Sequence, residues 1–353
     1  MYHLRLKVEH YQMGVKRGII LKKAKMSFPL HLDEFQLKHG KQSEKILQEF
    51  FPEVCEEIEG VSDTIGADYI TFASWMLCMG CCMYNLEENI PVEIRGCTAF
   101  AYTKNGRVIY GRNNDLPPYL RDGSKSEIYV PKNGNRFHIT TSSFINGEEG
   151  INEYGLAVAM TFVMTRLEKI RAGFNSCFVV RYLLEKAKSA DEAISLLMDL
   201  PVSSNCNILL ADKSGRMVVV ECTPFFKRIR EAEMFDHGCI VCTVNSFTSD
   251  EMKPYDDSDG NDYDSAKRYK VVIDSFEHDM KDDVIEDTRK LLKGDYGFMC
   301  QYDNEPDFET VWSSIFDLEN LSIFRAEGDP RKKKFIIDNR LHDIKAKEKC
   351  SEK

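Results

Sequence analysis

Residues 95–116 read RGCTAFAYTKNGRVIYGRNNDL. Two runs typical of β-strands, 97–103 and 107–112, lie on either side of the dipeptide Asn105-Gly106. Asn-Gly readily adopts the positive φ angles of a two-residue turn. The sequence therefore predicts a tight β-hairpin whose first strand starts with the cysteine.

The same hairpin brings three reactive groups together. Cys97 opens the first strand, and Arg112 and Asp115 lie at the end of the returning strand. Because the strands of an antiparallel hairpin run back alongside each other, both residues return to the neighbourhood of Cys97. A thiol, a guanidinium and a carboxylate are expected to meet through local geometry alone.

The residues before the hairpin have a different pattern. Apolar residues recur at helical spacing in 42–58 and 63–84, and only Pro52 interrupts them. We therefore expect residues 1–96 to form a helical N-terminal segment.

The residues after the hairpin alternate between strand and helix patterns. Helices are predicted within 172–200, where Ser189 and Glu192 have the spacing of a capping box. Further strands are predicted at 126–130, 137–142, 155–160, 207–211, 217–222 and 239–243. Helices segregated from antiparallel hairpins indicate an α+β fold with layered packing. The acidic stretch 250–264 and the charged tail 331–353 are expected to be mobile.

Composition restricts the environment and the partners. The chain has 353 residues, of which 43% are apolar and 29% are charged, and its net charge is −10. An acidic chain is a poor partner for a phosphate backbone, so we expect no nucleic acid. The sequence shows no signal peptide and no 18-residue apolar segment, which predicts a cytoplasmic protein that does not enter a membrane. Its twelve cysteines are expected to be reduced thiols packed as small apolar residues.

Five short motifs occur in a fixed order between residues 95 and 270. They are Gly96-Cys97-Thr98, Gly111-Arg112-Asn113-Asn114-Asp115, Gly150-Ile151-Asn152-Glu153-Tyr154-Gly155-Leu156, Thr243-Val244-Asn245-Ser246-Phe247 and Asp264-Ser265-Ala266-Lys267-Arg268. Each is weak alone, but their order and spacing resemble the N-terminal nucleophile (Ntn) hydrolases of the choloylglycine hydrolase and penicillin acyltransferase group. The long segment before Cys97 is most similar to the acyltransferase branch.

This resemblance implies a fold and a processing event. The fold would be a four-layer αββα sandwich of two antiparallel sheets. An inactive precursor would cut itself between Gly96 and Cys97. The products would be the helical segment 1–96, still associated, and a catalytic domain 97–330 followed by the tail 331–353. No cofactor is implied.

The chemistry explains why Cys97 would need to become an N-terminus. An ordinary thiol is only a few per cent ionised at neutral pH, whereas an α-amine can act as base for its own side chain. Arg112 would favour the thiolate, and Asp115 would orient the new amine. Asn245 could donate to the oxyanion of the tetrahedral intermediate, and Arg268 matches a family arginine near the site.

Two further residues have weaker assignments to a substrate pocket. Asn152 is more typical of a hairpin turn than of a catalytic site. Phe162 stands near the position where the family commonly has a polar residue, and it cannot donate a hydrogen bond. The second donor to the oxyanion is therefore open, and a backbone N–H could serve.

The expected substrate is a small-molecule linear amide or acyl thioester that passes through a Cys97 thioester. The sequence leaves open whether water or an acceptor amine takes the acyl group. It also leaves open whether the protein forms a homo-oligomer. The alternative is a non-catalytic protein on the same scaffold, stabilised by metal or binding a partner. Its thiolates would be Cys78, Cys81, Cys82, Cys239 and Cys242. Residues three apart on a strand point to opposite faces, which argues against zinc at the last pair, and we expect no metal site.

Overall fold

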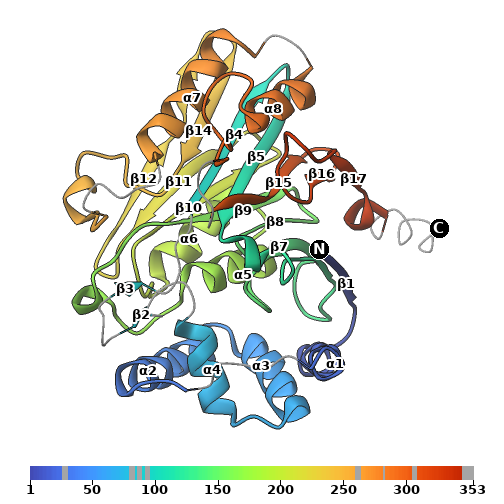
Figure 1. Ribbon diagram of the computed structural model, residues 1–353, viewed down its shortest axis with the longest axis vertical. Coiled ribbons are helices and arrows are strands. Elements are labelled where there is room, and N and C mark those ends of the chain that lie inside the picture. The colour runs from blue at the N-terminus through green and yellow to red at the C-terminus, as the bar shows by residue number, and fades with distance from the viewer. Residues whose placement is uncertain are drawn as a thin grey trace.

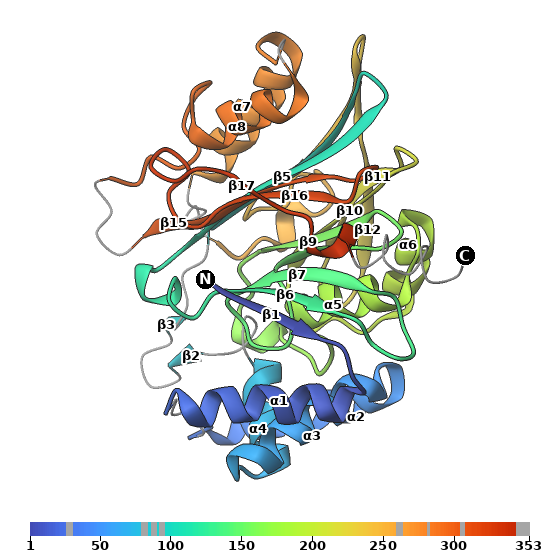
Figure 2. The same ribbon diagram turned by 90° about the vertical axis from the view of Figure 1, so that its right-hand side faces the viewer.

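A computed structural model describes residues 1–25, 31–78, 84–85, 90–91, 96–258, 264–280, 283–303 and 308–343. Two large sheets stack face to face between layers of helices (Figures 1 and 2). In the described residues, the first sheet has the strand order β1-β6-β7-β8-β9-β10-β11-β12 and the second β13-β14-β4-β5-β15-β16-β17. All neighbouring strands in them are antiparallel except β1 and β6. The predicted α+β sandwich is confirmed.

The strands of the first sheet are β1 (Tyr2–Leu6), β6 (Lys125–Tyr129), β7 (Phe137–Thr141), β8 (Glu149–Asn152), β9 (Leu156–Phe162), β10 (Cys206–Asp212), β11 (Met217–Cys222) and β12 (Lys227–Glu231). Those of the second are β4 (Gly96–Lys104), β5 (Arg107–Leu116), β13 (Glu233–Phe235), β14 (Gly238–Thr243), β15 (Glu309–Asp317), β16 (Ser322–Ala326) and β17 (Ile336–Asp338). A separate pair is formed by β2 (Tyr84–Asn85) and β3 (Ile90–Pro91).

Apolar side chains fill each space between layers. Ala99 and Tyr110 of the second sheet share a cluster with Leu209 of the first, so this cluster joins the two sheets. The outer face of the second sheet packs on α7 (Ser265–His278) and α8 (Val284–Lys293). The outer face of the first packs on α5 (Ser176–Lys186) and α6 (Ala190–Asp199). Short 3₁₀ helices lie at Pro118–Leu120, Leu167–Lys169 and Lys253–Tyr255.

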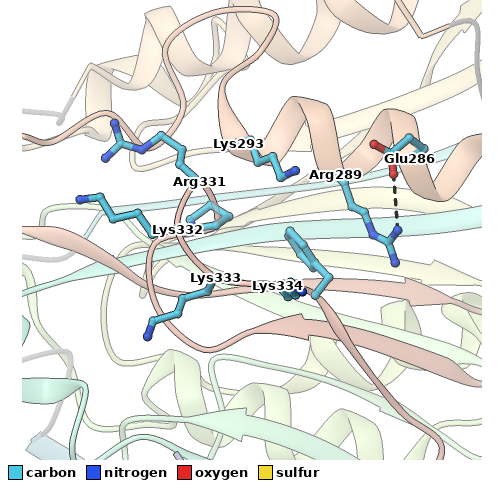
Figure 3. Close-up of a pocket in the computed structure, with 9 residues that line it drawn as sticks. Glu286, Arg289, Lys293, Arg331, Lys332, Lys333 and Lys334 are labelled. Atoms are coloured by element: carbon cyan, nitrogen blue, oxygen red, sulfur yellow. Dashed lines mark hydrogen bonds and ion pairs between the residues drawn. The ribbon is translucent and has the colours of Figure 1, made fainter.

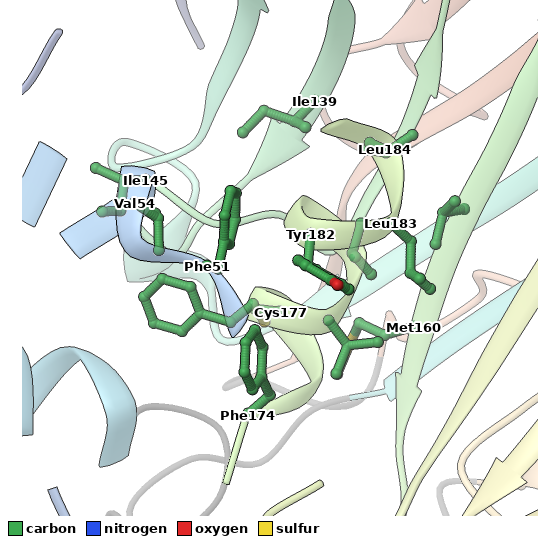
Figure 4. Close-up of a cluster of buried hydrophobic side chains, with 14 of the residues drawn as sticks. Phe51, Val54, Ile139, Ile145, Met160, Phe174, Cys177, Tyr182, Leu183 and Leu184 are labelled. Carbon is green, nitrogen blue, oxygen red and sulfur yellow. The ribbon is translucent and has the colours of Figure 1, made fainter. Parts of the chain in front are cut away.

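A further group of helices covers the layer of α5 and α6. It consists of α1 (His10–Lys23), α2 (Glu34–Phe50), α3 (Pro52–Ile65) and α4 (Tyr69–Cys78), drawn in blue below α5 in Figures 1 and 2. Figure 4 shows Phe51, between α2 and α3, near Phe174, which precedes α5, and Tyr182 of α5. Phe51 and Tyr182 make an edge contact with their ring centroids 5.4 Å apart.

Buried charges also join the N-terminal helices to the sandwich. Arg17 of α1 donates two hydrogen bonds to the Glu127 carboxylate of β6, at 2.8 and 2.7 Å. Glu57 of α3 accepts from Arg181 of α5 at 3.0 Å, and these four side chains are fully buried or nearly so. Because β1 also pairs with β6, residues before Cys97 belong to the folded sandwich.

The predicted helical ranges before residue 84 differ from the observed ones. The chain breaks at Phe51-Pro52, as the proline indicated, but α3 continues past 58 to Ile65. Gly66 then ends it in the left-handed conformation, at φ 76°. The strand β1 was not predicted, since its partner β6 lies more than 100 positions away.

Part of the C-terminal tail forms regular secondary structure. Ile336–Asp338 form β17 at the edge of the second sheet, so the expectation of a mobile tail is wrong for these residues. Residues 344–353 and 259–263 lie outside the described residues. Among the described helices, none is long and apolar enough to cross a membrane.

Candidate active site

The hairpin of β4 and β5 builds the site. Asn105 and Gly106 have φ angles of 53° and 72°, which confirms the predicted turn. The register places Cys97 opposite Asn114, and Gly96 opposite Asp115. Because side chains alternate along a strand, Cys97 and Asn114 share the face that looks toward the first sheet.

Arg112 and Asn114 surround the Cys97 sulfur. Arg112 Nη2 donates to Cys97 Sγ at 3.0 Å, and the thiol donates to Asn114 Oδ1 at 3.3 Å. Arg112 Nη1 donates to the backbone carbonyl of Met160 at 2.6 Å, which fixes the guanidinium between the two sheets. All three side chains are buried. A positive charge in direct contact with the sulfur favours its ionised form.

Asn245 and Arg268 hold the backbone of the same cysteine. Cys97 N donates to Asn245 Oδ1 at 2.6 Å, and Arg268 Nη1 donates to the Cys97 carbonyl oxygen at 2.6 Å. Arg268 Nη2 also donates to Asn245 Oδ1 at 3.0 Å. Asn245 follows β14 and Arg268 lies in the first turn of α7, so three elements converge on one residue.

Asp115 lies on the opposite face of the hairpin from the Cys97 side chain, as strand alternation requires. Its Oδ1 accepts from Thr310 Oγ1 at 2.6 Å and its Oδ2 from Tyr302 OH at 3.0 Å. Burial raises the pKa of Asp115 to about 6, against the opposing effect of Arg268 and the two hydroxyls. Asp115 is thus opposite Gly96, the residue before Cys97, but its carboxyl group does not meet the Cys97 thiol as the hairpin had led us to expect.

Gly96 is closely packed on the strand that carries Cys97. A Cβ atom on this residue would lie 2.6 Å from Cζ of Phe308 and 3.3 Å from Cβ of Asp115. Any other side chain would force the Phe308 ring or the strand to move. The residue before Cys97 is therefore packed between Phe308 and Asp115.

The two weaker assignments receive no support from the contacts. Asn152 donates to the carbonyls of Leu184 and Ala187 and accepts from the backbone N–H groups of Tyr154 and Leu156. Its amide therefore secures a turn against the end of α5.

Phe162 contacts the site residue Asn245 through its backbone carbonyl, which accepts a hydrogen bond from Asn245 Nδ2 at 3.0 Å. A substrate-pocket role for Phe162 or Asn152 stays a prediction.

Three residues of the site were not identified from the sequence. Asn114 could have been found, since it stands opposite Cys97 in the predicted hairpin. Tyr302 and Thr310 reach Asp115 from 187 and 195 positions away, and no local pattern marks them.

The proposed cysteine cluster for zinc is not formed by the described residues. Cys242 is buried against α7 and α8, whereas Cys239 packs toward the other sheet, as alternation requires. Cys81 and Cys82 lie outside the described residues. Across the described ranges, no group of three or more His, Cys, Asp or Glu side chains could hold a metal ion.

Cavities among the described residues lie beside α8 and beside the segment that follows it. One, of about 370 Å³, lies between α8 and the turn 330–335, and Arg289, Lys293 and Lys334 surround it (Figure 3). Another, of about 450 Å³, reaches Tyr302 and Thr310, the hydroxyl partners of Asp115. The surroundings of Asp115 are therefore connected to a cavity on this side of the molecule.

Comparisons with solved structures give distant likenesses. An N-acylethanolamine-hydrolyzing acid amidase ortholog from Caenorhabditis elegans is 14% identical, with a TM-score of 0.47, over 63% of this chain and 93% of that one. A conjugated bile acid hydrolase variant from Clostridium perfringens is 16% identical, with a TM-score of 0.48, over 65% and 89%. Penicillin V acylase from Agrobacterium tumefaciens is 17% identical, with a TM-score of 0.44, over 65% and 83%. A search of curated proteins gives no match.

A family model for acyl-coenzyme A:6-aminopenicillanic acid acyl-transferase matches residues 102–332. The match includes Arg112, Asp115, Asn245 and Arg268 and begins just after Cys97. It covers most of the chain, and of the strands of the two sheets only β1, β17 and the first part of β4 lie outside it among the described residues. The chain therefore belongs to the acyl-coenzyme A:6-aminopenicillanic acid acyl-transferase family of the Ntn hydrolase superfamily.

Proposed function

We propose that this protein is a self-processing cysteine hydrolase or acyltransferase, with Cys97 as nucleophile, that acts on linear amide or acyl thioester substrates. The observation that carries the proposal is the arrangement around one residue. Arg112 contacts the Cys97 sulfur at 3.0 Å, while Asn245 holds the Cys97 nitrogen at 2.6 Å. A structural cysteine needs neither contact.

Self-cleavage would begin with the thiol and the peptide bond before it. The Cys97 sulfur attacks the Gly96 carbonyl carbon, the C–N bond breaks, and the nitrogen takes the thiol proton to become an amine. Water then hydrolyses the Gly96 thioester and regenerates the thiol. In the intact chain Cys97 is buried, which suits an intramolecular attack and excludes competing reactions.

Turnover would use the groups that cleavage leaves behind. The liberated α-amine of Cys97 takes the thiol proton, and Asn245 Oδ1, already its partner, keeps it oriented. The thiolate attacks the substrate carbonyl, and the amine or thiol leaving group departs with the proton. Water or an acceptor amine then receives the acyl group.

The charged neighbours have separate roles in this scheme. Arg112 stabilises the thiolate by direct contact. Asp115, next to the cleaved bond, stabilises the new ammonium when it is ionised. Arg268 holds the Cys97 carbonyl and Asn245 in place. No step requires a cofactor.

The cleaved chains 1–96 and 97–353 would stay together. They are joined by the strand β1, by the Phe51 contact and by the ion pair of Arg17 with Glu127. We expect the protein to work in the cytoplasm, where its thiols stay reduced.

The substitution Cys97→Ala tests the nucleophile. We expect the variant to remain one uncleaved chain of about the full 40.7 kDa and to hydrolyse no acyl substrate, because it lacks the attacking sulfur. Denaturing gel electrophoresis and an acylation assay measure both effects. Cys55→Ala, which removes another buried thiol, is the control and should be processed normally. Normal fragments from Cys97→Ala would refute the scheme.

A further inference from the structure

The Asn114 amide is held in one orientation beside the nucleophile. Its Oδ1 accepts from Arg112 Nη2 at 2.6 Å, from Arg112 Nε at 3.1 Å and from the Cys97 thiol at 3.3 Å. Turning the amide over would place its NH₂ group against the donors of the guanidinium. The contacts with Arg112 and Cys97 therefore fix which end of the amide faces them.

The other end of this amide is a buried donor that lacks a partner. Asn114 is fully buried, and its Nδ2 atom has no hydrogen-bond partner among the described residues. A buried amide donor in this state is unfavourable, and most native proteins avoid it. Its cost is explained if Nδ2 acquires a partner during the reaction.

The Asn245 amide, in contrast, is already engaged. Its Nδ2 donates to the Phe162 carbonyl at 3.0 Å, and its Oδ1 accepts hydrogen bonds from Cys97 N and Arg268 Nη2. Phe162 itself has no side-chain donor. Asn114 thus provides the side-chain donor next to the sulfur whose hydrogen bond is unused in the described structure.

We propose that Asn114 Nδ2 donates a hydrogen bond to the oxyanion of the tetrahedral intermediate formed at Cys97. This inference rests on the proposed function. When Sγ bonds to the acyl carbon, the π electrons of the carbonyl move to its oxygen, which becomes the anion. That oxygen lies one bond from the acyl carbon and two from Sγ, within reach of an amide whose Oδ1 already contacts the sulfur. When the oxyanion collapses, the leaving group departs and the hydrogen bond weakens.

Two reactions of the same sulfur separate this role from support of the thiol. Iodoacetamide alkylates Cys97 by displacing iodide at a saturated carbon, and forms no oxyanion. The ester p-nitrophenyl acetate acylates Cys97 through one. Both rates are measured on the full-length protein, the first by mass spectrometry of the peptide that contains Cys97. Their ratio reports stabilisation of the oxyanion and is insensitive to how much thiol is reactive.

We expect the ratio of acylation to alkylation to fall about 10²- to 10³-fold in Asn114→Leu. The matched control is Asn135→Leu, because Asn135 is also buried but donates to the Leu184 and Ala187 carbonyls. It should lower the melting temperature and leave the ratio unchanged. Thermal unfolding identifies the folded variants, and Asn114→Ala replaces Asn114→Leu if leucine prevents folding.

An unchanged ratio in the folded Asn114 variant would overturn this inference, while wild-type acylation at Cys97 would keep the proposed function. A wild-type protein that is alkylated but never acylated at Cys97 would overturn both. The two failures are therefore distinguishable from one set of measurements.

Discussion

The carboxyl group of Asp115 is buried between two hydroxyl donors, Tyr302 and Thr310. Burial raises its pKa to about 6, whereas an aspartate in an unfolded chain has a pKa of about 3.9. Between these values the unfolded chain has lost its proton and the folded chain keeps it. The free energy of unfolding contributed by this group therefore falls as the pH rises from about 4 to about 6, by up to about 3 kcal/mol, and is constant above.

Asp115→Asn removes this pH dependence. In the uncleaved Cys97→Ala background, we expect the stability of Asp115→Asn relative to Asp115 to increase by up to about 3 kcal/mol between pH 4 and pH 7. Urea unfolding at both pH values measures the difference. Asp122→Asn, at an exposed position, should show no such change. A relative stability that stays level or falls would contradict a raised pKa at Asp115.

For the contacts between single residues of the site, the sequence alone was informative only where the residues are close together in the chain. Cys97 and Arg112 were predicted to meet because the Asn105-Gly106 turn folds one strand onto the other. The positions of Asn245 and Arg268 could be expected only from the resemblance to a family, because they come from β14 and α7. The hydroxyl groups of Tyr302 and Thr310, which donate to Asp115 from distant segments, leave no local pattern in the sequence.

At the scale of elements, a buried arginine of α1, Arg17, joins this helix to the sandwich. Arg17 donates to Glu127 and Tyr129 of β6 and lies 3.8 Å from Glu57 of α3. Its neighbours Gly14 and Gly18 allow α1 to approach α3 closely, since a Cβ at Gly14 would lie 2.0 Å from the Glu57 carbonyl oxygen. Both carboxylates are buried and depend on their cations.

Arg17→Met should destabilise the uncleaved protein by about 3–5 kcal/mol, because it leaves buried carboxylates without this cation. Urea unfolding in the Cys97→Ala background measures the loss. Lys16→Met changes the neighbouring, exposed residue in the same way and should alter stability by less than about 0.5 kcal/mol. Equal stability of Arg17→Met and its parent would show that α1 does not depend on this contact.

Helices and strands with strong periodicity, such as the β4–β5 hairpin and the Ser189 cap of α6, were predicted correctly. The unpredicted strands include β1 and β17, each of which is short and is stabilised by an edge of a sheet built from distant residues. They also include β15, a longer strand held between β5 and β16. Local pattern identifies an element that carries its own turn or cap, and fails for one that depends on its neighbours.

For the whole molecule, the described part of the N-terminal segment supplies β1 and the helices α1 to α4 to the same body as the nucleophile (Figure 2). Cleavage before Cys97 would cut the chain at the start of β4, inside the sandwich and not in a linker. The contacts of β1 and α1 with β6 would then keep the two products bound.

The mass of the purified wild-type protein, measured under denaturing and native conditions, tests the central claim most directly. The account predicts two chains on denaturation, residues 1–96 and a chain whose first residue is Cys97, which together weigh one water more than the intact protein. Native conditions should show both in one complex. A single uncut chain under denaturing conditions, or a cut anywhere other than before Cys97, would contradict it.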